Sequence, residues 1–338
     1  MTAIAVPDVL ARARDAVQPA MVAAIDGLNP ELRPVAAYHL GWCDERGAPT
    51  SGGGGKGVRP ALALLSAEAA GADAGTGIPG AVAVELVHNF SLLHDDVIDG
   101  DRERRHRPTV WALYGIGPAV IVGDALVALA HQTLQRSGSP GAADANAALT
   151  DAVAAMIAGQ AEDMAFEGRA HVTAEECLGM VAGKTGALLA CASAIGARLA
   201  GAPPAMIEAL GSYGAHLGVA FQAVDDLLGI WGDPERTGKP RGSDLATRKK
   251  SLPVVHALAS PEPAAGELRA LLANGPLDAG AVARGSELVE AGGGRCATEA
   301  LARRHLDAAC RALELPELVP AACAELTDLA RFVVEREF

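Results

Sequence analysis

Two pairs of adjacent aspartates, each at the end of an apolar run, constrain this chain more than any other feature. In the first run, Asp95, Asp96 and Asp99 follow a stretch of apolar, helix-compatible residues. In a helix, Asp95 and Asp99 lie about one turn apart on one face, so both carboxylates can point at the same hard cation. Oxygen ligands favour Mg²⁺, which takes part of its shell from water and substrate phosphate. The alternative interpretation is an acidic helix end that binds no metal.

The second pair, Asp225 and Asp226, repeats this pattern much further along the chain. Carboxylates at the C-terminal end of a helix are unfavourable against the helix dipole unless a cation is bound there. Basic residues follow both pairs, in segments 102–107, 236–241 and 248–250. Two acidic helix ends, each followed by a basic loop, predict metal ions and a polyphosphate held between two facing helices.

The composition favours an all-helical fold. Half of the residues are hydrophobic (50%) and long segments show helical periodicity, whereas strand formers are diluted. Thr173 and Glu176 have the spacing of a capping box at a helix start. We find no domain boundary and no repeat of 20–50 residues, so residues 1–338 are expected to form a single all-α bundle. Helices are expected over 3–27, 31–46, 58–71, 80–99, 116–137, 143–167 and 203–229.

Charge and hydropathy exclude several classes of protein. The net charge of −13 argues against nucleic acid as a partner. The chain contains no uninterrupted apolar run of about 18 residues, so no membrane span is expected. The N-terminus lacks the basic and apolar regions of a secretion signal, and the six cysteines show no Cys-x-x-Cys spacing. We therefore expect a cytoplasmic protein with reduced, structural cysteines.

A glycine-rich loop precedes the helix expected to begin near residue 58. It contains Lys56, and Arg59 follows at the helix start. The loop is not a Walker motif, because no Ser or Thr follows the lysine. It is either a flexible linker or a phosphate-binding loop, since backbone donors and the helix dipole favour an anion at a helix N-terminus.

Taken in order, these motifs resemble the trans-isoprenyl (polyprenyl) diphosphate synthase family, of the farnesyl and geranylgeranyl diphosphate synthase type. The similarity runs from the Lys56-Gly57-Val-Arg59-Pro60 block to Lys249-Lys250-Ser251-Leu-Pro253. The other matching motifs are His88, Asp95-Asp96-x-x-Asp99, Arg104-Arg105, Gly159-Gln160, Lys184-Thr185-Gly186, Phe221-Gln222-x-x-Asp225-Asp226 and Gly238-Lys239. The resemblance implies the isoprenoid synthase fold, a large helical bundle with a central cavity, usually as a homodimer.

The resemblance also implies a role for each matching residue. The diphosphate of isopentenyl diphosphate would be held by Lys56, Arg59, His88 and Arg105. The Mg²⁺ ligands around the allylic diphosphate would be Asp95, Asp99 and Asp225, with Asp96 and Asp226 supporting them. The cationic clamp on the allylic diphosphate would be Arg104, Lys184, Lys239 and Lys249. Thr185 and Gln222 would line the reaction site.

The implied reaction explains these residue types. An allylic prenyl diphosphate ionises, and the resulting cation alkylates the double bond of isopentenyl diphosphate. Mg²⁺, Arg and Lys would stabilise the charge that develops on the leaving diphosphate. No side chain stands out as a general base, so the resemblance implies that the departing diphosphate accepts the proton. Apolar helix walls would exclude water from the cation.

The helix that carries Asp95 is also expected to set product length, since one helical turn rises about 5.4 Å, comparable with one five-carbon unit. Phe90 stands five residues before Asp95, Ser91 four before and Val87 eight before. In the family that the chain resembles, an aromatic residue at the fifth position, without an insertion in the aspartate motif, implies a geranylgeranyl diphosphate synthase. The alternative is that Phe90 is an ordinary core residue.

Two positions depart from the family pattern and keep two alternatives open. Gly57 stands where an Arg is usual, and Gly229 where a third Asp is usual; Asp233 would compensate only if the helix continues. A terpene cyclase on the same fold is one alternative, although cyclases line their pockets with aromatic faces and only 3% of residues here are aromatic. An inactive regulatory subunit is the other, although it would be expected to lose the aspartate pairs.

Overall fold

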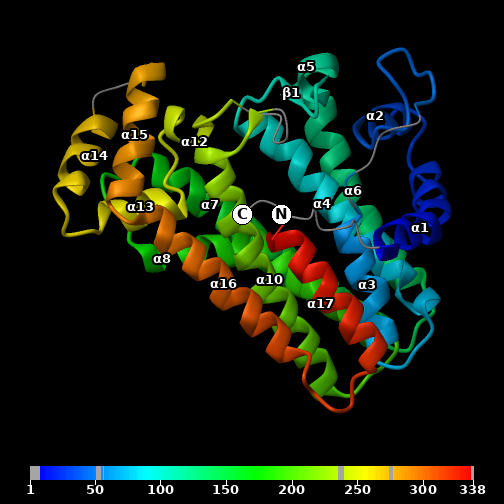
Figure 1. Cartoon of the computed structure of the whole chain (residues 1–338). Helices are drawn as coiled ribbons and strands as arrows, with labels where there is room; N and C mark the ends of the chain where they lie inside the picture. Colours follow the sequence, from blue (N-terminus) through cyan, green and yellow to red (C-terminus); the bar gives the residue numbers. More distant parts are fainter. Residues whose placement is uncertain (1–7, 51–54, 56, 235–239, 274–276, 336–338) are drawn as a thin grey trace.

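The computed structural model describes residues 8–50, 55, 57–234, 240–273 and 277–335. These residues are almost entirely helical, which confirms the predicted all-α class (Figure 1). A short antiparallel pair, β1 (Glu103–Arg104) and β2 (Arg107–Pro108), forms a hairpin after the first aspartate motif. The helices are α1 Asp8–Asp26, α2 Arg33–His39, α3 Val58–Ala69, η1 Ala74–Gly77, α4 Ile78–Ile98, α5 Val110–Tyr114, α6 Ile116–Arg136, α7 Ala142–Glu167, α8 Ala174–Val181, η2 Ala182–Gly186, α9 Ala187–Leu199, α10 Pro204–Trp231, α12 Ser243–Ala246, α13 Leu252–Leu258, α14 Pro263–Ala273, α15 Ala279–Ala291, α16 Gly294–Ala312 and α17 Pro320–Glu335.

Most long helices lie close to their predicted ranges, because apolar periodicity marks the buried face of a bundle helix. The helix predicted over 31–46 is the exception, since α2 ends at His39. Two residues later Gly41 takes a left-handed φ of +74°. The chain then pairs Cys43 with Pro49 in an isolated bridge instead of continuing the helix.

The bundle packs around α4, α9 and α10. Helix α4 lies against α6 and α3, whereas α10 lies against α9 and α16, as Figure 1 shows for α10 and α16. One apolar cluster joins these helices through fully buried residues such as Leu86, Leu126 and Leu217. A second, smaller cluster under α12–α15 includes Ile230 at the end of α10. The single-domain organisation of residues 1–338 stays a prediction.

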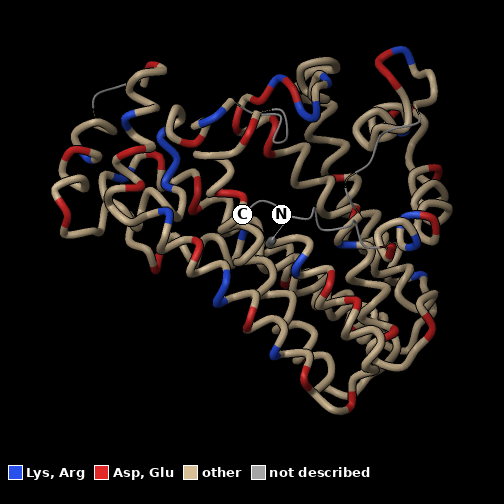
Figure 2. Tube along the Cα trace, in the orientation of Figure 1, with Lys and Arg blue, Asp and Glu red and all other residues tan. Residues whose placement is uncertain are grey.

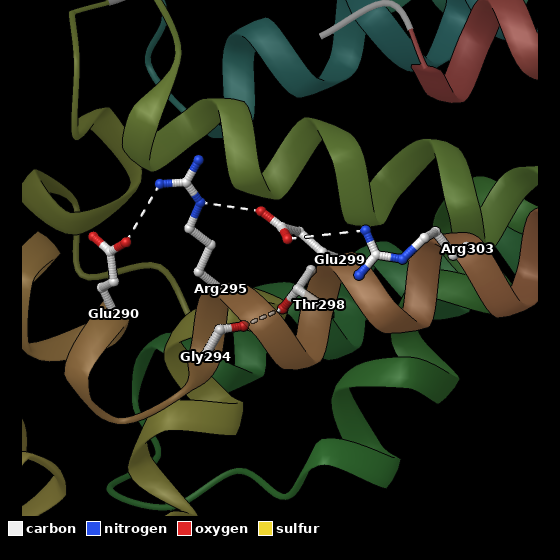
Figure 3. A network of polar contacts seen from close by, with 6 residues as sticks. All are labelled: Glu290, Gly294, Arg295, Thr298, Glu299 and Arg303. Atoms are coloured by element: carbon white, nitrogen blue, oxygen red, sulfur yellow. Dashed lines mark hydrogen bonds and ion pairs between the residues drawn. The ribbon is translucent and has the colours of Figure 1, made fainter. Parts of the chain in front are cut away.

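A polar network around Arg295 connects the start of α16 with the end of α15 (Figure 3). The Arg295 guanidinium lies 5.3 Å from the centre of the Trp231 ring, which closes α10. The same guanidinium is 3.1 Å from a carboxylate oxygen of Glu299 and 3.5 Å from one of Glu290. These contacts pack α16 and the end of α15 against the segment that follows Asp225.

The Lys184 segment is placed by a predicted cap and a close helix contact. Thr173 and Glu176 form the predicted capping box at the start of α8. The next turn, η2, is π-helical, a geometry that often occurs at functional sites. It approaches α7 so closely that a Cβ on Gly159 would lie 2.4 Å from the backbone nitrogen of Lys184. The glycine therefore allows Lys184 to reach α7.

Two helical segments are long and apolar enough to cross a membrane, by length and composition alone, and this finding goes against the expectation that the chain has none. They are Ile116–Arg136 and Ala174–Leu199, in which 33% and 56% of the apolar window is buried inside the protein. A buried core helix of a soluble protein passes the same test, so two such segments are weak evidence for a membrane. The absence of a span and the cytoplasmic location stay predictions.

Candidate active site

The last turn of α4 places the first carboxylates. Asp95 lies one turn before the helix end, and the backbone nitrogen of Asp99 donates to the Asp95 carbonyl at 2.8 Å. Burial raises the pKa of Asp95 to about 6, with the Lys184 ammonium opposing this shift and the Asp99 carboxylate adding to it. The pKa of Asp99 is raised by burial as well. The two carboxylates therefore interact electrostatically, as the helical spacing predicts.

Asp96, the residue after Asp95, forms an ion pair with Arg104. Its buried carboxylate accepts a hydrogen bond from Arg104 Nε at 2.7 Å, which ties β1 to α4. Asp96 also raises the pKa of the adjacent Asp95, and its expected role in supporting the metal ligands stays a prediction. Arg104 binds Asp96 and also lowers the pKa of Asp95, and its role in the cationic clamp stays a prediction.

The end of α10 also carries an aspartate with hydrogen-bond partners inside the protein. Asp226 is buried and accepts hydrogen bonds from the backbone nitrogen of Leu252 and from Gln222 Nε2, both at 2.9 Å. Gln222 in turn accepts from Thr185 Oγ1 at 2.8 Å. Asp226 therefore anchors the start of α13 to α10, and its supporting role beside Asp225 stays a prediction. Gln222 and Thr185 lie together, as expected.

Two lysines lie between the acidic helix ends. Lys184 Nζ is 2.6 Å from an oxygen of Asp163 on α7, and both side chains are mostly buried. Burial alone would lower the pKa of Lys249, but Asp226, Asp244, Asp163 and Asp225 together hold it above its usual value. Asp163 was not among the predicted site residues. Its signal was a carboxylate one turn after Gln160 on the polar side of α7.

These lysines link the two aspartate motifs into one site. Lys184 lowers the pKa of both Asp95 and Asp99, and Lys249 acts on Asp99 of α4 as well as on Asp225 and Asp226 of α10. Such interactions decline steeply with distance. The ends of α4 and α10 are therefore electrostatically coupled, and Figure 2 shows that acidic and basic segments occur together around β1 and near α12.

The carboxylates suit a cation that is bound partly by substrate. In the described part of the chain, no group of three or more His, Cys, Asp or Glu side chains is close enough to hold a metal unaided. Asp95, Asp99 and Asp225 nevertheless offer oxygen ligands only, and burial disfavours the bare charge on Asp95 and Asp99. This donor set fits Mg²⁺, which binds through one or two carboxylates plus water and phosphate oxygens.

A second group of cationic residues surrounds the start of α3 and the middle of α4. Burial and the neighbouring Arg59 and Arg105 guanidiniums lower the pKa of His88 well below its usual value, so its imidazole is neutral. The Nε atom of Arg59 is buried without a hydrogen-bond partner. This group brings together three of the four residues expected to bind isopentenyl diphosphate. Lys56 and Lys239 lie outside the described residues.

Glu85 lies beside the arginines of this group, and it was not among the predicted site residues. Burial raises the pKa of its carboxyl, whereas Arg59, a hydrogen bond from Asn89 and Arg105 lower it. Glu85 therefore faces two of the arginines expected to hold a diphosphate. A lone acidic residue within the apolar run of α4 was the available signal.

The candidate chain-length residues lie on α4 before Asp95. Phe90 is buried and packs edge-on against His94, with ring centres 4.7 Å apart. The His94 ring also contacts the Val120 carbonyl of α6 at 3.1 Å. Val87 is fully buried, and Ser91 donates to the His88 carbonyl at 2.9 Å. Phe90 therefore contributes to the packing between α4 and α6.

Both departures from the family pattern have a structural cause. Gly57 precedes α3 with φ at +70°, a left-handed conformation that is strained for other residues. A Cβ on Gly229 would lie 2.4 Å from the Asp244 carboxylate carbon, so Asp244 occupies the space that a side chain at 229 would need. Because α10 ends at Trp231, Asp233 lies beyond the helix, and the condition under which it would compensate is not met.

An all-α bundle with two aspartate-bearing helix ends and two cationic groups defines a class of prenyl-transferring enzymes, and comparison with known proteins identifies the family. Residues 42–289 match the family model for polyprenyl synthetase. The chain is 49% identical to (2E,6E)-farnesyl diphosphate synthase and 44% identical to geranylgeranyl diphosphate synthase, both of Mycobacterium tuberculosis. Each match covers 97% of this chain and 93% of the relative. The crystal structure of a polyprenyl synthetase from Streptomyces coelicolor superposes with a TM-score of 0.93 at 51% identity, covering 97% of this chain and 99% of that one. The chain belongs to the polyprenyl synthetase family and is a prenyltransferase.

Proposed function

We propose that this prenyltransferase condenses isopentenyl diphosphate with an allylic prenyl diphosphate in a Mg²⁺-dependent reaction and releases geranylgeranyl diphosphate. The coupling of the α4 and α10 carboxylates through Lys184 and Lys249 carries this proposal. A site with carboxylates on both sides and cations between them suits a diphosphate bridged by metal ions. The second cationic group, around Arg59, His88 and Arg105, suits a second diphosphate, so two substrates can be held at once.

Each part of the site has a role in this reaction. Mg²⁺ would be held by Asp95, Asp99 and Asp225 and would supply positive charge for the leaving diphosphate. Lys184 and Lys249 bind the same diphosphate and stabilise it as the carbon–oxygen bond breaks. The allylic carbon then bonds to the double bond of isopentenyl diphosphate held by the second cationic group. The released diphosphate takes the proton, and the apolar helices exclude water.

Product length is the finer part of the proposal. Phe90 is a buried aromatic residue, and the small Ser91 stands beside it. This arrangement supports a prenyl product that grows to twenty carbons before the Phe90 ring blocks it. Farnesyl diphosphate is the second candidate, because the relative at 49% identity is a farnesyl diphosphate synthase.

Incubation with isopentenyl diphosphate and dimethylallyl, geranyl or farnesyl diphosphate tests the proposal, with Mg²⁺ and with a chelator. We expect linear C20 diphosphate by mass spectrometry and no product in the chelator. Arrest at C15 would support the farnesyl candidate. Cyclic hydrocarbon, or no reaction, would point to the cyclase or to the inactive subunit.

We also propose that the enzyme is a homodimer formed through α6 and α7. These helices pack together, yet they expose Ile116 and Ile121 on α6, and Ile157 and Met164 on α7. Each of these side chains is about half exposed, whereas most large apolar side chains are buried. Exposed large apolar side chains gathered on two neighbouring helices suit an interaction surface.

A further inference from the structure

Three side chains link α4 to α2 behind the predicted isopentenyl diphosphate residues. Glu85 and Asn89 are one turn apart on α4, so they share a face. Asn89 Nδ2 donates to the Glu85 carbonyl at 2.8 Å and lies 3.3 Å from Glu85 Oε1. Because both contacts use the amide nitrogen, the amide oxygen of Asn89 can accept a hydrogen bond from His39, the last residue of α2.

The His39 ring is a neutral acceptor. Burial lowers the pKa of His39 to about 3, and Arg104 and Arg105 contribute to the shift, which contacts with Asn89 partly offset. A neutral imidazole carries one proton. If the ring donates this proton in a hydrogen bond to Asn89, Nε2 keeps a free lone pair. This Nε2 is buried and has no hydrogen-bond partner.

The hairpin between β1 and β2 brings two arginines to this ring. Arg105 and His106 have left-handed φ values of +53° and +60°, so the turn sends neighbouring side chains in different directions. Arg104 is held by Asp96. Arg105 extends toward the glycine-rich loop, where a Cβ on Gly55 would lie 3.3 Å from its Nη2. His39, Asn89, Arg104 and Arg105 line one cavity, which does not include Asp95 or Asp99 among its walls.

We propose that His39 is a positioning residue for Arg105. With isopentenyl diphosphate bound, the free His39 nitrogen accepts a hydrogen bond from the Arg105 guanidinium and fixes it against the diphosphate. A buried acceptor without a partner costs stability. That cost is removed when Arg105 supplies the missing donor in the substrate complex. The inference rests on the proposed function, because it assumes that Arg105 binds the isopentenyl diphosphate.

Two variants of His39 and a matched control at Tyr38 test this role. His39→Phe keeps a ring of similar shape and removes both nitrogens, whereas His39→Gln restores an acceptor. Loss of one hydrogen bond to a charged group is expected to raise the KM for isopentenyl diphosphate about tenfold in His39→Phe. The KM for the allylic substrate and the melting temperature should change little, and His39→Gln should recover part of the loss. Tyr38→Phe loses a 2.7 Å bond to the Pro108 carbonyl and an interaction of the hydroxyl with Arg107, and it should keep both KM values.

Calorimetric binding of isopentenyl diphosphate alone provides a second measurement. It should be weaker in His39→Phe than in the wild type. An active wild type together with an unchanged KM in His39→Phe would refute the positioning role and leave the proposed function intact. A rise of both KM values with a lower melting temperature would show a structural role instead and would refute it too. A wild type that neither binds isopentenyl diphosphate nor forms linear product would refute the proposed function.

Discussion

The Asp244 carboxylate occupies the space beside Gly229 on α10. A Cβ at 229 would lie 2.4 Å from two of its atoms, so the glycine is required for this contact. Asp244 is also one of the carboxylates that hold the pKa of Lys249 high. The second motif thus lacks its third carboxylate, and the Asp244 carboxylate of α12 lies beside that position instead.

Gly229→Ala should displace Asp244. Overpacking of this kind is expected to lower the free energy of unfolding by about 1–3 kcal/mol, measured by urea denaturation. The rate of product formation should fall as well, because the carboxylate moves away from Lys249. Asp244→Asn separates the two effects, since it keeps the volume and removes the charge. If Asp244→Asn has the wild-type rate, the contact serves packing alone.

Phe90→Ala should lengthen the product beyond that of the wild type. Removing the ring opens space one turn before Asp95, where the growing chain is expected to end. Mass spectrometry of the products measures this directly. Phe166→Ala on α7 is the matched control, because it also removes a buried aromatic ring, and it should destabilise the protein without changing product length. An unchanged product spectrum in Phe90→Ala would mean that Phe90 is only a core residue.

Asp163→Asn should destabilise the protein through Lys184. The Lys184 and Asp163 side chains are 25% and 17% exposed and 2.6 Å apart, so the substitution leaves a largely buried ammonium without its partner. We expect a loss of about 1–3 kcal/mol in the free energy of unfolding. Asp144→Asn breaks the more exposed pair of Asp144 with Arg198, also at 2.6 Å, and should cost less than about 1 kcal/mol. Equal losses in the two variants would contradict this account.

Much of this structure was predictable from the sequence, because bundle helices bury one periodic apolar face and the aspartate pairs end two such helices. The residues that contact Lys184 and Gly229 were not predictable from the sequence. Asp163 meets Lys184, and Asp244 meets Gly229, through contacts between elements that no local pattern encodes. The partners of Asp96 and Asp226 were not predictable for a related reason. Adjacent aspartates on a helix point in different directions, and only packing decides which groups each one meets.

Stability should fall in acid because the largely enclosed His39 ring is neutral. Its pKa is about 3 in the folded protein, against an ordinary value of 6.5, so between these values the unfolded chain binds the proton first. The free energy of unfolding therefore falls as pH drops below 6.5, by up to about 1.4 kcal/mol per pH unit from this group. The raised pKa values of Asp95 and Asp226 act in the opposite direction. Their contribution is common to the wild type and His39→Gln, so it cancels when the two proteins are compared. Urea denaturation at pH 7, 6 and 5 should give a shallower slope for His39→Gln, and parallel slopes would contradict the prediction.

A carboxylate introduced on the exposed face of α6 and α7 should separate the subunits. Ile121 and Ile157 are 55% and 52% exposed, so a carboxylate at either position does not disturb the core of one chain. In a dimer interface the same carboxylate would be buried without a partner, which is strongly unfavourable. Light scattering after size exclusion should show a dimer for the wild type and a monomer for Ile121→Asp and Ile157→Asp. Val22→Asp on α1, at a site 38% exposed, is the control and should remain dimeric. If the wild type instead is monomeric and sediments with lipid vesicles, the apolar face of α6 contacts a membrane and the proposed interface is wrong.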